Sequence, residues 1–406
     1  MQGDPFFIQP IEPLYFGQAR SFSAGESHSG RSQFPPTPFT FQGLVRSHLL
    51  RSVTNPVLNL DDWSKTAKAE REKLIGPPGK LPETWQLQGP YPAQKVHISG
   101  ESREWLAPWV PAPRFMLQSS QENRPEPARI ISSSHPGLDD RGEDKPLSLG
   151  RPDRPDAKPL HGWIGPDNLA LALDPKGNHR WDPDQQRAQR PPFVHEEVRP
   201  GIQIDSQTGT VSPGMLYTLN TLRFDSKSGF VGSFSGLLDH HRIKPHPLIQ
   251  GVGGMGNRNR VVQFEKPAPF HPSWQRIFSG QHLPRQVEKN HTFWLLTLNP
   301  VRLQDLNHPL TEDALSPQVR IRFLGAMLGK LQVLGGFYMS KAQSHANRQF
   351  VPAGSAWLFR LEGGEDRERR EVLQQLNDAH LIGDPQEQAF GFGHTVVGIG
   401  PTSWKE

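Results

Sequence analysis

The chain of 406 residues contains no cysteine. A disulfide framework, a zinc–thiolate site and a cysteine nucleophile are therefore excluded, and the composition fits a reducing compartment. The first twelve residues lack the basic start and the apolar run of a signal peptide, and no later apolar run is long enough to span a bilayer. We therefore expect a soluble, cytoplasmic protein that has no membrane partner.

Acidic residues are missing from three long stretches, although the net charge of the whole chain is only +4. These stretches carry Arg31, Arg46 and Arg51 (Ser27 to Leu60); Arg242, Lys244, Arg258 and Arg260 (His240 to Phe264); and Arg320, Arg322, Lys330, Lys341, Arg348 and Arg360 (Ala314 to Leu361). Segregated positive charge suits a polyanionic partner, because each neutralised phosphate releases condensed counterions. A solvated basic surface remains the alternative.

Hydrophobic residues make up 34% of the chain, which is enough for a large core and favours two packed domains. Residues 6–11 form an apolar run typical of a buried first strand. Thr37 and Pro38 then supply a helix cap and a first helical residue, and apolar residues recur at helical spacing until Asn55-Pro56. Residues 201–205, 215–219, 222–224 and 230–231 predict successive strands, of which one pair forms a hairpin.

In the second half of the chain, residues 291–298 predict a strand at the centre of a sheet. Residues 319–334 have helix-like spacing, and residues 366–376 predict a charged helix with Val372, Leu373 and Leu376 on one face. The segment from Gln121 to Leu160 is rich in Pro, Asp, Arg, Gly and Ser, so we expect a long mobile insertion there. Strand and helix signals that alternate without a long repeat favour an α+β fold.

A glycine-rich segment is the first candidate for a phosphate-binding loop. It comprises Gly253, Gly254, Met255, Gly256, Asn257 and Arg258, with Arg260 two residues further on. Glycines let backbone N–H groups approach phosphate oxygens, and arginines add bidentate charge. It is not a nucleotide-binding P-loop, because no Gly-Lys-Ser/Thr ending follows. A tight turn between two strands is the alternative.

Three further groups of residues are candidates for RNA contact. Gly391, Phe392, Gly393 and His394 predict a second loop, in which Phe392 or His394 stacks on an unpaired base and His394 is exposed; Phe392 in the core is an equal alternative. Arg46 and Arg51 flank the apolar stripe of the first helix, where a solvated flank is the other possibility. Lys341, His345 and Arg348 lie in a polar segment that predicts a loop beside a sheet.

Two enzyme hypotheses follow from the 17 histidines. A metal-independent RNase would need a histidine pair, and the candidates are His28, His48, His240, His241 and His246. Neighbouring histidines could also bind a metal, but no acid or cysteine lies at a familiar ligand spacing. Surface or hydrogen-bonded histidines are the favoured interpretation, so we expect no catalytic residue, no metal and no cofactor.

Five blocks of the sequence resemble a known family, the RAMP subunit of type III-B CRISPR (Cmr) effectors that binds the 5′ handle of the guide RNA. The blocks are residues 8–16 with Arg20-Ser21-Phe22; residues 34–38 with 42–46; residues 197–205 with 214–218; residues 251–256 with Arg258 and Arg260; and residues 351–355 with 391–398. They occur in the expected order along nearly the whole chain. The turn Gly17-Gln18-Ala19-Arg20 and the residue after Gly43 depart from the family pattern.

The resemblance implies two ferredoxin-like, RRM-related domains in close contact, which we expect at residues 1–225 and 226–406. It also implies a non-catalytic subunit that binds the 5′ handle of the crRNA, contacts target RNA only indirectly, and bridges the large polymerase-like subunit to the backbone RAMP subunits in antiviral defence. Arg20 joins the RNA-binding candidates on this ground. Because the aromatic RNP signature is absent, we expect backbone and loop contacts to dominate. The alternative function is a metal-independent RNase that processes guide precursor RNA.

Overall fold

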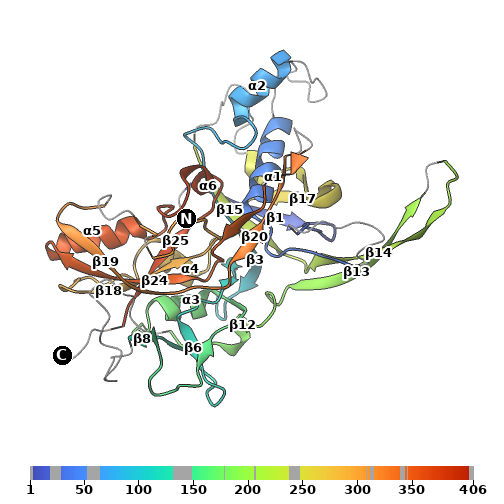
Figure 1. The fold of residues 1–406 in the computed structure, drawn as a ribbon. Coiled ribbons are helices and arrows are strands. Elements are labelled where there is room, and N and C mark those ends of the chain that lie inside the picture. Colours follow the sequence, from blue (N-terminus) through green and yellow to red (C-terminus); the bar gives the residue numbers. More distant parts are fainter. Residues whose placement is uncertain are drawn as a thin grey trace.

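The computed structural model describes residues 3–18, 29–52, 65–130, 149–177, 179–204, 207–236, 247–307, 309–310, 315–338, 343–344 and 346–401. Two antiparallel sheets form its centre, and a long hairpin extends away from the body (Figure 1). Helices and strands both contribute to the core, so the predicted α+β class is confirmed.

The first sheet has six strands in the order β16-β17-β1-β15-β3-β4. Their bounds are β1 Asp4–Pro10, β3 Gln86–His97, β4 Glu104–Pro108, β15 Ser228–Ser235, β16 Val252–Met255 and β17 Arg260–Glu265. Successive side chains of a strand point to opposite faces. In β1, Phe6 and Ile8 join one apolar core while Phe7 joins another, so this strand is buried on both faces. The predicted first strand is confirmed.

Helix α1 (Pro38–Arg51) covers one face of the first sheet. Thr37 is its N-cap and accepts a hydrogen bond from the backbone N–H of Thr40, and Pro38 occupies the first helical position. The ring of Phe41 stacks on that of Phe6, with 5.5 Å between centroids. The predicted helix is confirmed, although it ends at Arg51, before Asn55-Pro56.

The second sheet has four strands in the order β19-β24-β18-β25. They are β18 Thr292–Thr297, β19 Val319–Met327, β24 Ala356–Gly363 and β25 Thr395–Ile399. Every residue of β18 is buried, and this strand lies between two others, as predicted. Helix α5 (Asp366–Leu376) covers one face with Val372, Leu373 and Leu376, which confirms the predicted charged helix.

A middle core lies between the two sheets. Phe7 and Val231 come from the first sheet, whereas Trp294, Leu296 and Val396 come from the second. Apolar surface removed from water stabilises a fold by about 25 cal/mol per Å², so the two sheets stabilise each other. The two sheets therefore share the middle core, and each packs its other face into an outer core of its own.

The domain boundary expected at 225/226 can be compared with the sheets. The first sheet combines β1, β3 and β4, which precede that position, with β15, β16 and β17, which follow it. A division there would cut this sheet.

The remaining elements lie around the two sheets. The other helices are α2 Lys65–Ile75, α3 Pro166–Leu173, α4 Pro272–Phe278 and α6 Pro385–Ala389, with short 3-10 turns at Pro183–Gln185, Pro247–Ile249 and Asn257–Asn259. The other strands are β2 Ser29–Arg31, β5 Val110–Pro111, β6 Met116–Gln118, β7 Glu126–Pro127, β8 Arg129–Ile130, β9 Leu149–Gly150, β10 Lys158–Pro159, β11 Trp163–Ile164, β12 Gln186–Arg187, β13 Val194–Ile204, β14 Val211–Phe224, β20 Gln332–Leu334, β21 Phe337–Tyr338, β22 Gln343–Ser344 and β23 Arg348–Phe350. Within the described ranges, no helix is both long and apolar enough to cross a bilayer.

Strands β13 and β14 pair antiparallel and form the extended hairpin, which we call the arm (Figure 1). The two strands predicted at 215–219 and 222–224 are one continuous strand, β14. Strand β14 pairs with β13 and β2, while β15 pairs with β1 and β3. The turn at Asp225–Lys227 therefore carries the chain from one sheet to another, so β14 and β15 form no hairpin; among the predicted strands, the paired ones are those of the arm.

The helix expected at residues 319–334 is wrong. This segment forms β19 and β20 instead. Val319 and Ile321 are buried, whereas Arg320 between them is exposed, and this alternation is the period of a strand. Pairing with β24, including a register shift between Phe323 and Gly325, overrides the helix-like spacing.

The described ends of the segment 121–160 correct a second expectation, that no packed element forms there. Ala128 and Leu160 are buried in the middle core. Arg151, only 5% exposed, donates hydrogen bonds to Glu122 and Asp153, and these contacts raise its pKa above the usual value. Polar composition hid these elements, because one of their buried side chains is an arginine that is paired with Glu122 and Asp153. Residues 131–148 lie outside the described residues.

Replacing Thr37 by Ala should lower the free energy of unfolding by about 1 kcal/mol, because the first turn of α1 loses its side-chain cap. Urea unfolding followed by circular dichroism measures the change. Ser47, which is exposed in the middle of the same helix, provides the matched control as Ser47→Ala. Equal stability of Thr37→Ala and the parent would contradict the capping role.

Candidate nucleic-acid interface

The predicted glycine loop is a hairpin, made of β16, a short turn and β17. Gly253 packs against α1: a Cβ atom added there would lie 2.8 Å from Leu44 Cδ1. Met255 is buried, with 1% of its surface exposed. Gly253 and Met255 therefore pack against the body of the protein, and the expected open cradle is wrong for these two residues.

The turn of this hairpin is the part that faces solvent. Gly256, Arg258 and Asn259 all have positive φ angles, of 70°, 60° and 48°. Such angles are rare for residues with a side chain, and they occur mainly in turns. Asn257 and Arg258 are exposed, and the backbone N–H of Asn257 donates to Tyr15 O at 2.9 Å. The tight turn, one of the two alternatives, is present, and it carries an exposed arginine.

Arg258 connects this turn with the arm. Its guanidinium lies 3.5 Å from the hydroxyl oxygen of Tyr217, which belongs to β14. Three residues further along β14, Asn220 pairs with Arg31 of β2, and Arg31 is exposed. Basic residues from the first two acid-free stretches therefore both lie beside β14.

Arg260, Arg46 and Arg51 have different surroundings. Arg260 is half-buried and pairs with Glu12 at 3.4 Å. The guanidinium of Arg46 donates to the carbonyls of Gly76 and Pro77 after α2, and burial lowers its pKa to about 10. Arg46 therefore holds α2 in place, so the alternative of a solvated flank is wrong for it, and its contact with RNA stays a prediction. Arg51, at the end of α1, is exposed.

Several arginines of the third acid-free stretch pair with acids that lie outside it. Arg322 and Arg360 both pair with Glu362, and Arg348 pairs with the buried Glu387 at 3.0 Å. An acid-free run in the sequence is therefore no guide to the local charge in the fold. Lys341 and His345, like Arg20 and the basic residues Arg242 and Lys244, lie outside the described residues.

The second predicted loop is buried. Phe392 and His394 are 1% and 0% exposed, so the expected exposure of His394 is wrong and Phe392 is a core residue. The ring of Phe392 packs on Phe39 and on Phe350, at centroid distances of 4.7 and 5.0 Å. A side chain without exposed surface cannot stack on a base in this conformation.

The two glycines of this loop allow close backbone contacts. Gly391 and Gly393 have φ angles of 106° and 65°. A Cβ atom on Gly391 would lie 2.9 Å from Gly89 O in β3, and one on Gly393 would lie 2.5 Å from Ile382 O. Their role in the described structure is to let the loop pack tightly, which their sequence context does not distinguish from phosphate binding.

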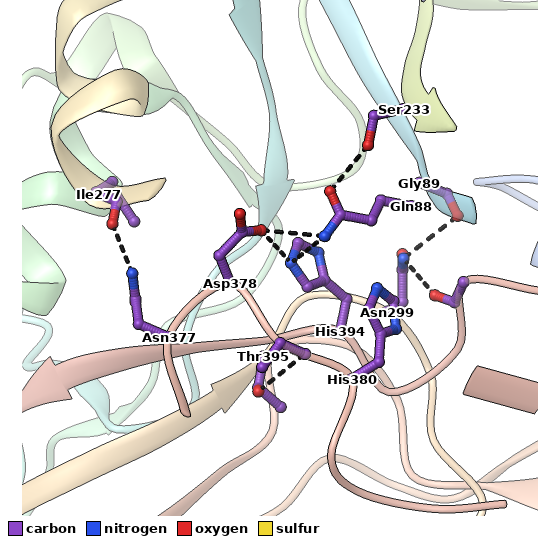
Figure 2. Close-up of polar contacts among 12 residues, drawn as sticks. Gln88, Gly89, Ser233, Ile277, Asn299, Asn377, Asp378, His380, His394 and Thr395 are labelled. Carbon is purple, nitrogen blue, oxygen red and sulfur yellow. Dashed lines mark hydrogen bonds and ion pairs between the residues drawn. The ribbon is translucent and has the colours of Figure 1, made fainter. Parts of the chain in front are cut away.

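A buried polar network, which the sequence analysis missed, surrounds His394 (Figure 2). Its Nε2 lies 2.8 Å from Asp378 Oδ1, and its Nδ1 contacts the hydroxyl of Tyr91. His380 stacks on His394, with 4.7 Å between ring centroids. No sequence motif joins these residues, since Tyr91 and His394 are 303 positions apart.

The charges of this network follow from burial. Burial alone would raise the pKa of Asp378, but the hydrogen bond from His394 helps to hold it below its usual value. Burial, together with the charge of Asp378, raises the pKa of Tyr91 well above its usual value. Asp378 is therefore the hydrogen-bond acceptor of the network, and the Tyr91 hydroxyl stays protonated and able to donate.

The structure also bears on the enzyme hypotheses. His48 is 5% exposed, stacks on Phe264 at 3.9 Å and contacts Gln250 O at 3.0 Å. It cannot act as an acid or a base on RNA from this position. The other histidine candidates, at 28, 240, 241 and 246, lie outside the described residues. In the part of the chain that the structure describes, no three acidic or histidine side chains are grouped so that they could hold a metal.

Fold and interface together define an α+β protein whose basic hairpin turn lies next to a projecting arm. Residues 6–399 match the family described as CRISPR-associated protein (Cas_Cmr3). The chain belongs to this family, which confirms the predicted Cmr effector subunit.

Two solved structures resemble the chain, with 16% sequence identity, over 87% of this chain and 86% of theirs. Both are cryo-EM structures of the type III-B Cmr-beta complex bound to cognate target RNA, one of them also with AMPPnP, and their TM-scores are 0.43 and 0.44. None of the curated proteins matches the chain.

The network supports a prediction about pH. Burial lowers the pKa of His380 to about 3. In the unfolded chain the pKa of His380 is about 6.5. At a pH between this pKa and the lower pKa of the folded chain, His380 binds a proton only when the chain is unfolded. The free energy of unfolding should therefore decrease as the pH is lowered through this window. His380 contributes at most about 1.4 kcal/mol per pH unit to this decrease. His380→Phe keeps a ring on His394 but removes the titrating nitrogens.

Urea unfolding between pH 7 and pH 5 should accordingly show a shallower loss of stability for His380→Phe than for the parent. A slope for His380→Phe equal to that of the parent would show that His380 does not titrate on unfolding.

Proposed function

We propose that this chain is a non-catalytic subunit of a type III-B CRISPR effector that binds the 5′ handle of the crRNA. The observation that carries the proposal is the exposed turn of Gly256 to Asn259, which presents Arg258 beside Tyr217 of the arm. A guanidinium can bind phosphate in bidentate geometry, and an aromatic ring next to it can stack on a base. Membership of the Cas_Cmr3 family supports this class of function.

The order of the strands supports two ferredoxin-like modules. In that fold, the sheet order is fourth-first-third-second, and a helix follows the first and the third strand. β17-β1-β15-β3 has this order in the first sheet, with α1 between β1 and β3. β25-β18-β24-β19 has it in the second, with α5 between β24 and β25. Of the two helices expected in each module, the described residues include one, α1 in the first module and α5 in the second.

The RNA should be recognised mainly through its backbone. RRM-like sheets stack bases on aromatic residues of their open face. In the first sheet here, the face that carries Phe7, Tyr91 and Val231 is buried in the middle core. The sheet face is therefore occupied by protein, and the hairpin turn and the arm are the parts left to contact RNA. Among the candidate residues, Gly256, Asn257 and Arg258 are the best placed, with Arg31 and Arg51 as further exposed cations.

We also propose that the chain bridges the large polymerase-like subunit and the backbone RAMP subunits, and contacts target RNA only indirectly. The arm is the obvious part to reach a neighbour, because it extends from the body (Figure 1). Val198, Ile202 and Ile204 on β13 are 62%, 48% and 58% exposed, which suits contact with protein.

The competing function is a metal-independent RNase that processes guide precursor. Incubating the purified chain with labelled repeat RNA separates the two, and we expect binding without cleavage. Cleavage that is lost on replacement of His28 or His246 would favour the RNase instead. Burial of His48 removes one member of the histidine set on which that function was based.

Replacing Arg258 by Ala should weaken binding of handle RNA about tenfold near 0.1 M salt, because one exposed phosphate contact is lost. The slope of log affinity against log salt concentration should also become shallower by about one. Fluorescence anisotropy across a salt series measures both quantities. Arg367 on α5, 88% exposed, is the control as Arg367→Ala and should change neither.

Unchanged affinity and salt slope for Arg258→Ala would contradict the proposed role of the turn. A second measurement compares the natural handle with a scrambled sequence of equal length. Equal affinity for both would limit recognition to the RNA backbone.

A further inference from the structure

Six buried polar residues lie where the two sheets face each other, and we call them the polar lock. Gln88 and Tyr91 belong to β3 and Ser233 to β15, in the first sheet; Asn299 follows β18, Asp378 follows α5 and His394 precedes β25, in the second module. Their exposed fractions run from 0% to 5%. Figure 2 shows all of them except Tyr91, with Gln88 and Ser233 facing Asn299, Asp378 and His394.

The hydrogen bonds of the polar lock form one consistent chain of donors. Asn299 Nδ2 donates to the Tyr91 hydroxyl at 3.2 Å, and that hydroxyl donates to His394 Nδ1. His394 Nε2 donates to Asp378 Oδ1 at 2.8 Å. From the other side, Gln88 Nε2 donates to the same oxygen at 3.1 Å, and Ser233 Oγ donates to Gln88 Oε1 at 2.9 Å.

Most of these bonds cross between the modules. Tyr91–His394, Gln88–Asp378 and Tyr91–Asn299 each join β3 to the second module. Asn299 Nδ2 also donates to Gly391 O at 2.8 Å and to Gly89 O at 3.3 Å, so it ties the terminal loop to β3. Gly391 has no side chain that would separate the two backbones, as the close approach to Gly89 O requires.

Apolar contacts alone would not fix the orientation of the two sheets. The hydrophobic effect is non-directional, and a sliding shift of one sheet over the other would keep much of the middle core buried. The polar lock tolerates no such shift, because a displaced donor or acceptor would be buried without a partner. Buried polar groups can specify one arrangement in this way.

We infer that the polar lock sets the relative orientation of the two modules, and that Tyr91 and His394 are its central positioning residues. The RNA-facing turn and the arm adjoin the first sheet, whereas the loop from Gly391 to His394 belongs to the second module. The proposed RNA contacts therefore lie on the first module alone, because the loop of the second module is buried. The inference about orientation does not rest on the proposed function.

The absence of cysteine makes a direct measurement possible. Ser47 on α1 and Gln374 on α5 are exposed, so Ser47→Cys and Gln374→Cys place one spin label on each module of the full chain. Double electron–electron resonance spectroscopy then gives the distribution of distances between the two spin labels. The labelled parent should show one narrow distribution.

Tyr91→Phe removes a single hydroxyl and leaves His394 Nδ1 and Asn299 without that partner. We expect the distance distribution to become at least twofold broader. Ser228→Ala is the control, because it removes a buried hydroxyl whose bond, to Asp225 O at 2.7 Å, does not cross between modules. It should keep the narrow distribution.

A distribution in Tyr91→Phe as narrow as in the parent would overturn the inference. Equal broadening in Tyr91→Phe and Ser228→Ala would overturn it too, since general loosening would then be the cause. Asp378→Asn tests the other end of the chain of donors and should broaden the distribution as well; should it fail to fold, Tyr91→Phe still decides.

RNA binding gives the second readout. Handle RNA should bind Tyr91→Phe as tightly as the parent and with the same salt slope, because no phosphate contact is removed and the RNA-facing turn lies on the first module. Weaker binding by Tyr91→Phe would show that the change disturbs the first module itself, and would overturn a role limited to orientation. If the parent itself binds no RNA, the proposed function fails, and the distance measurement still tests the lock.

Discussion

The shared middle core is the constraint on which the rest of the structure depends. Strands β1 and β18 each send alternate side chains into it and into an outer core, as Phe7 and Phe6 do in the first sheet and Trp294 and Phe293 in the second. Neither sheet could leave the other without exposing one complete face to water. The face of the first sheet that meets the middle core is therefore covered by protein, which is why we propose the turn of the β16–β17 hairpin and the arm for contact with RNA.

The sequence was sufficient to predict an element where one short segment contains both the residue pattern and the contacts that stabilise the element. Thr37-Pro38 specifies the start of α1, and the spacing of Val372, Leu373 and Leu376 specifies α5. They failed at residues 319–334, where pairing with β24 decides the structure. The buried ends of the 121–160 segment were missed for the same reason: Arg151 is stabilised by Glu122, 29 residues away.

Among the candidate site residues, too, the sequence predicted the environment of some correctly and of others wrongly. Arg258 was identified from its glycine-rich surroundings, and it is exposed in a turn. Gly391, Phe392, Gly393 and His394 have an equally glycine-rich context but are buried against β3 and α1. Glycine permits positive φ angles and close approach in both cases, and only the fold decides whether the neighbour is another backbone or solvent.

Charge shows the same dependence on the fold. Arg348 and Arg302 share the buried carboxylate of Glu387, although the sequence around Arg348 contains no acid. Arg46 instead uses its charge on the carbonyls that follow α2. Such arginines stabilise the fold and have little free charge to offer, because a buried carboxylate or a helix end already occupies them. Arg258 differs because its contact is a neutral tyrosine hydroxyl, so its full charge remains available to a phosphate.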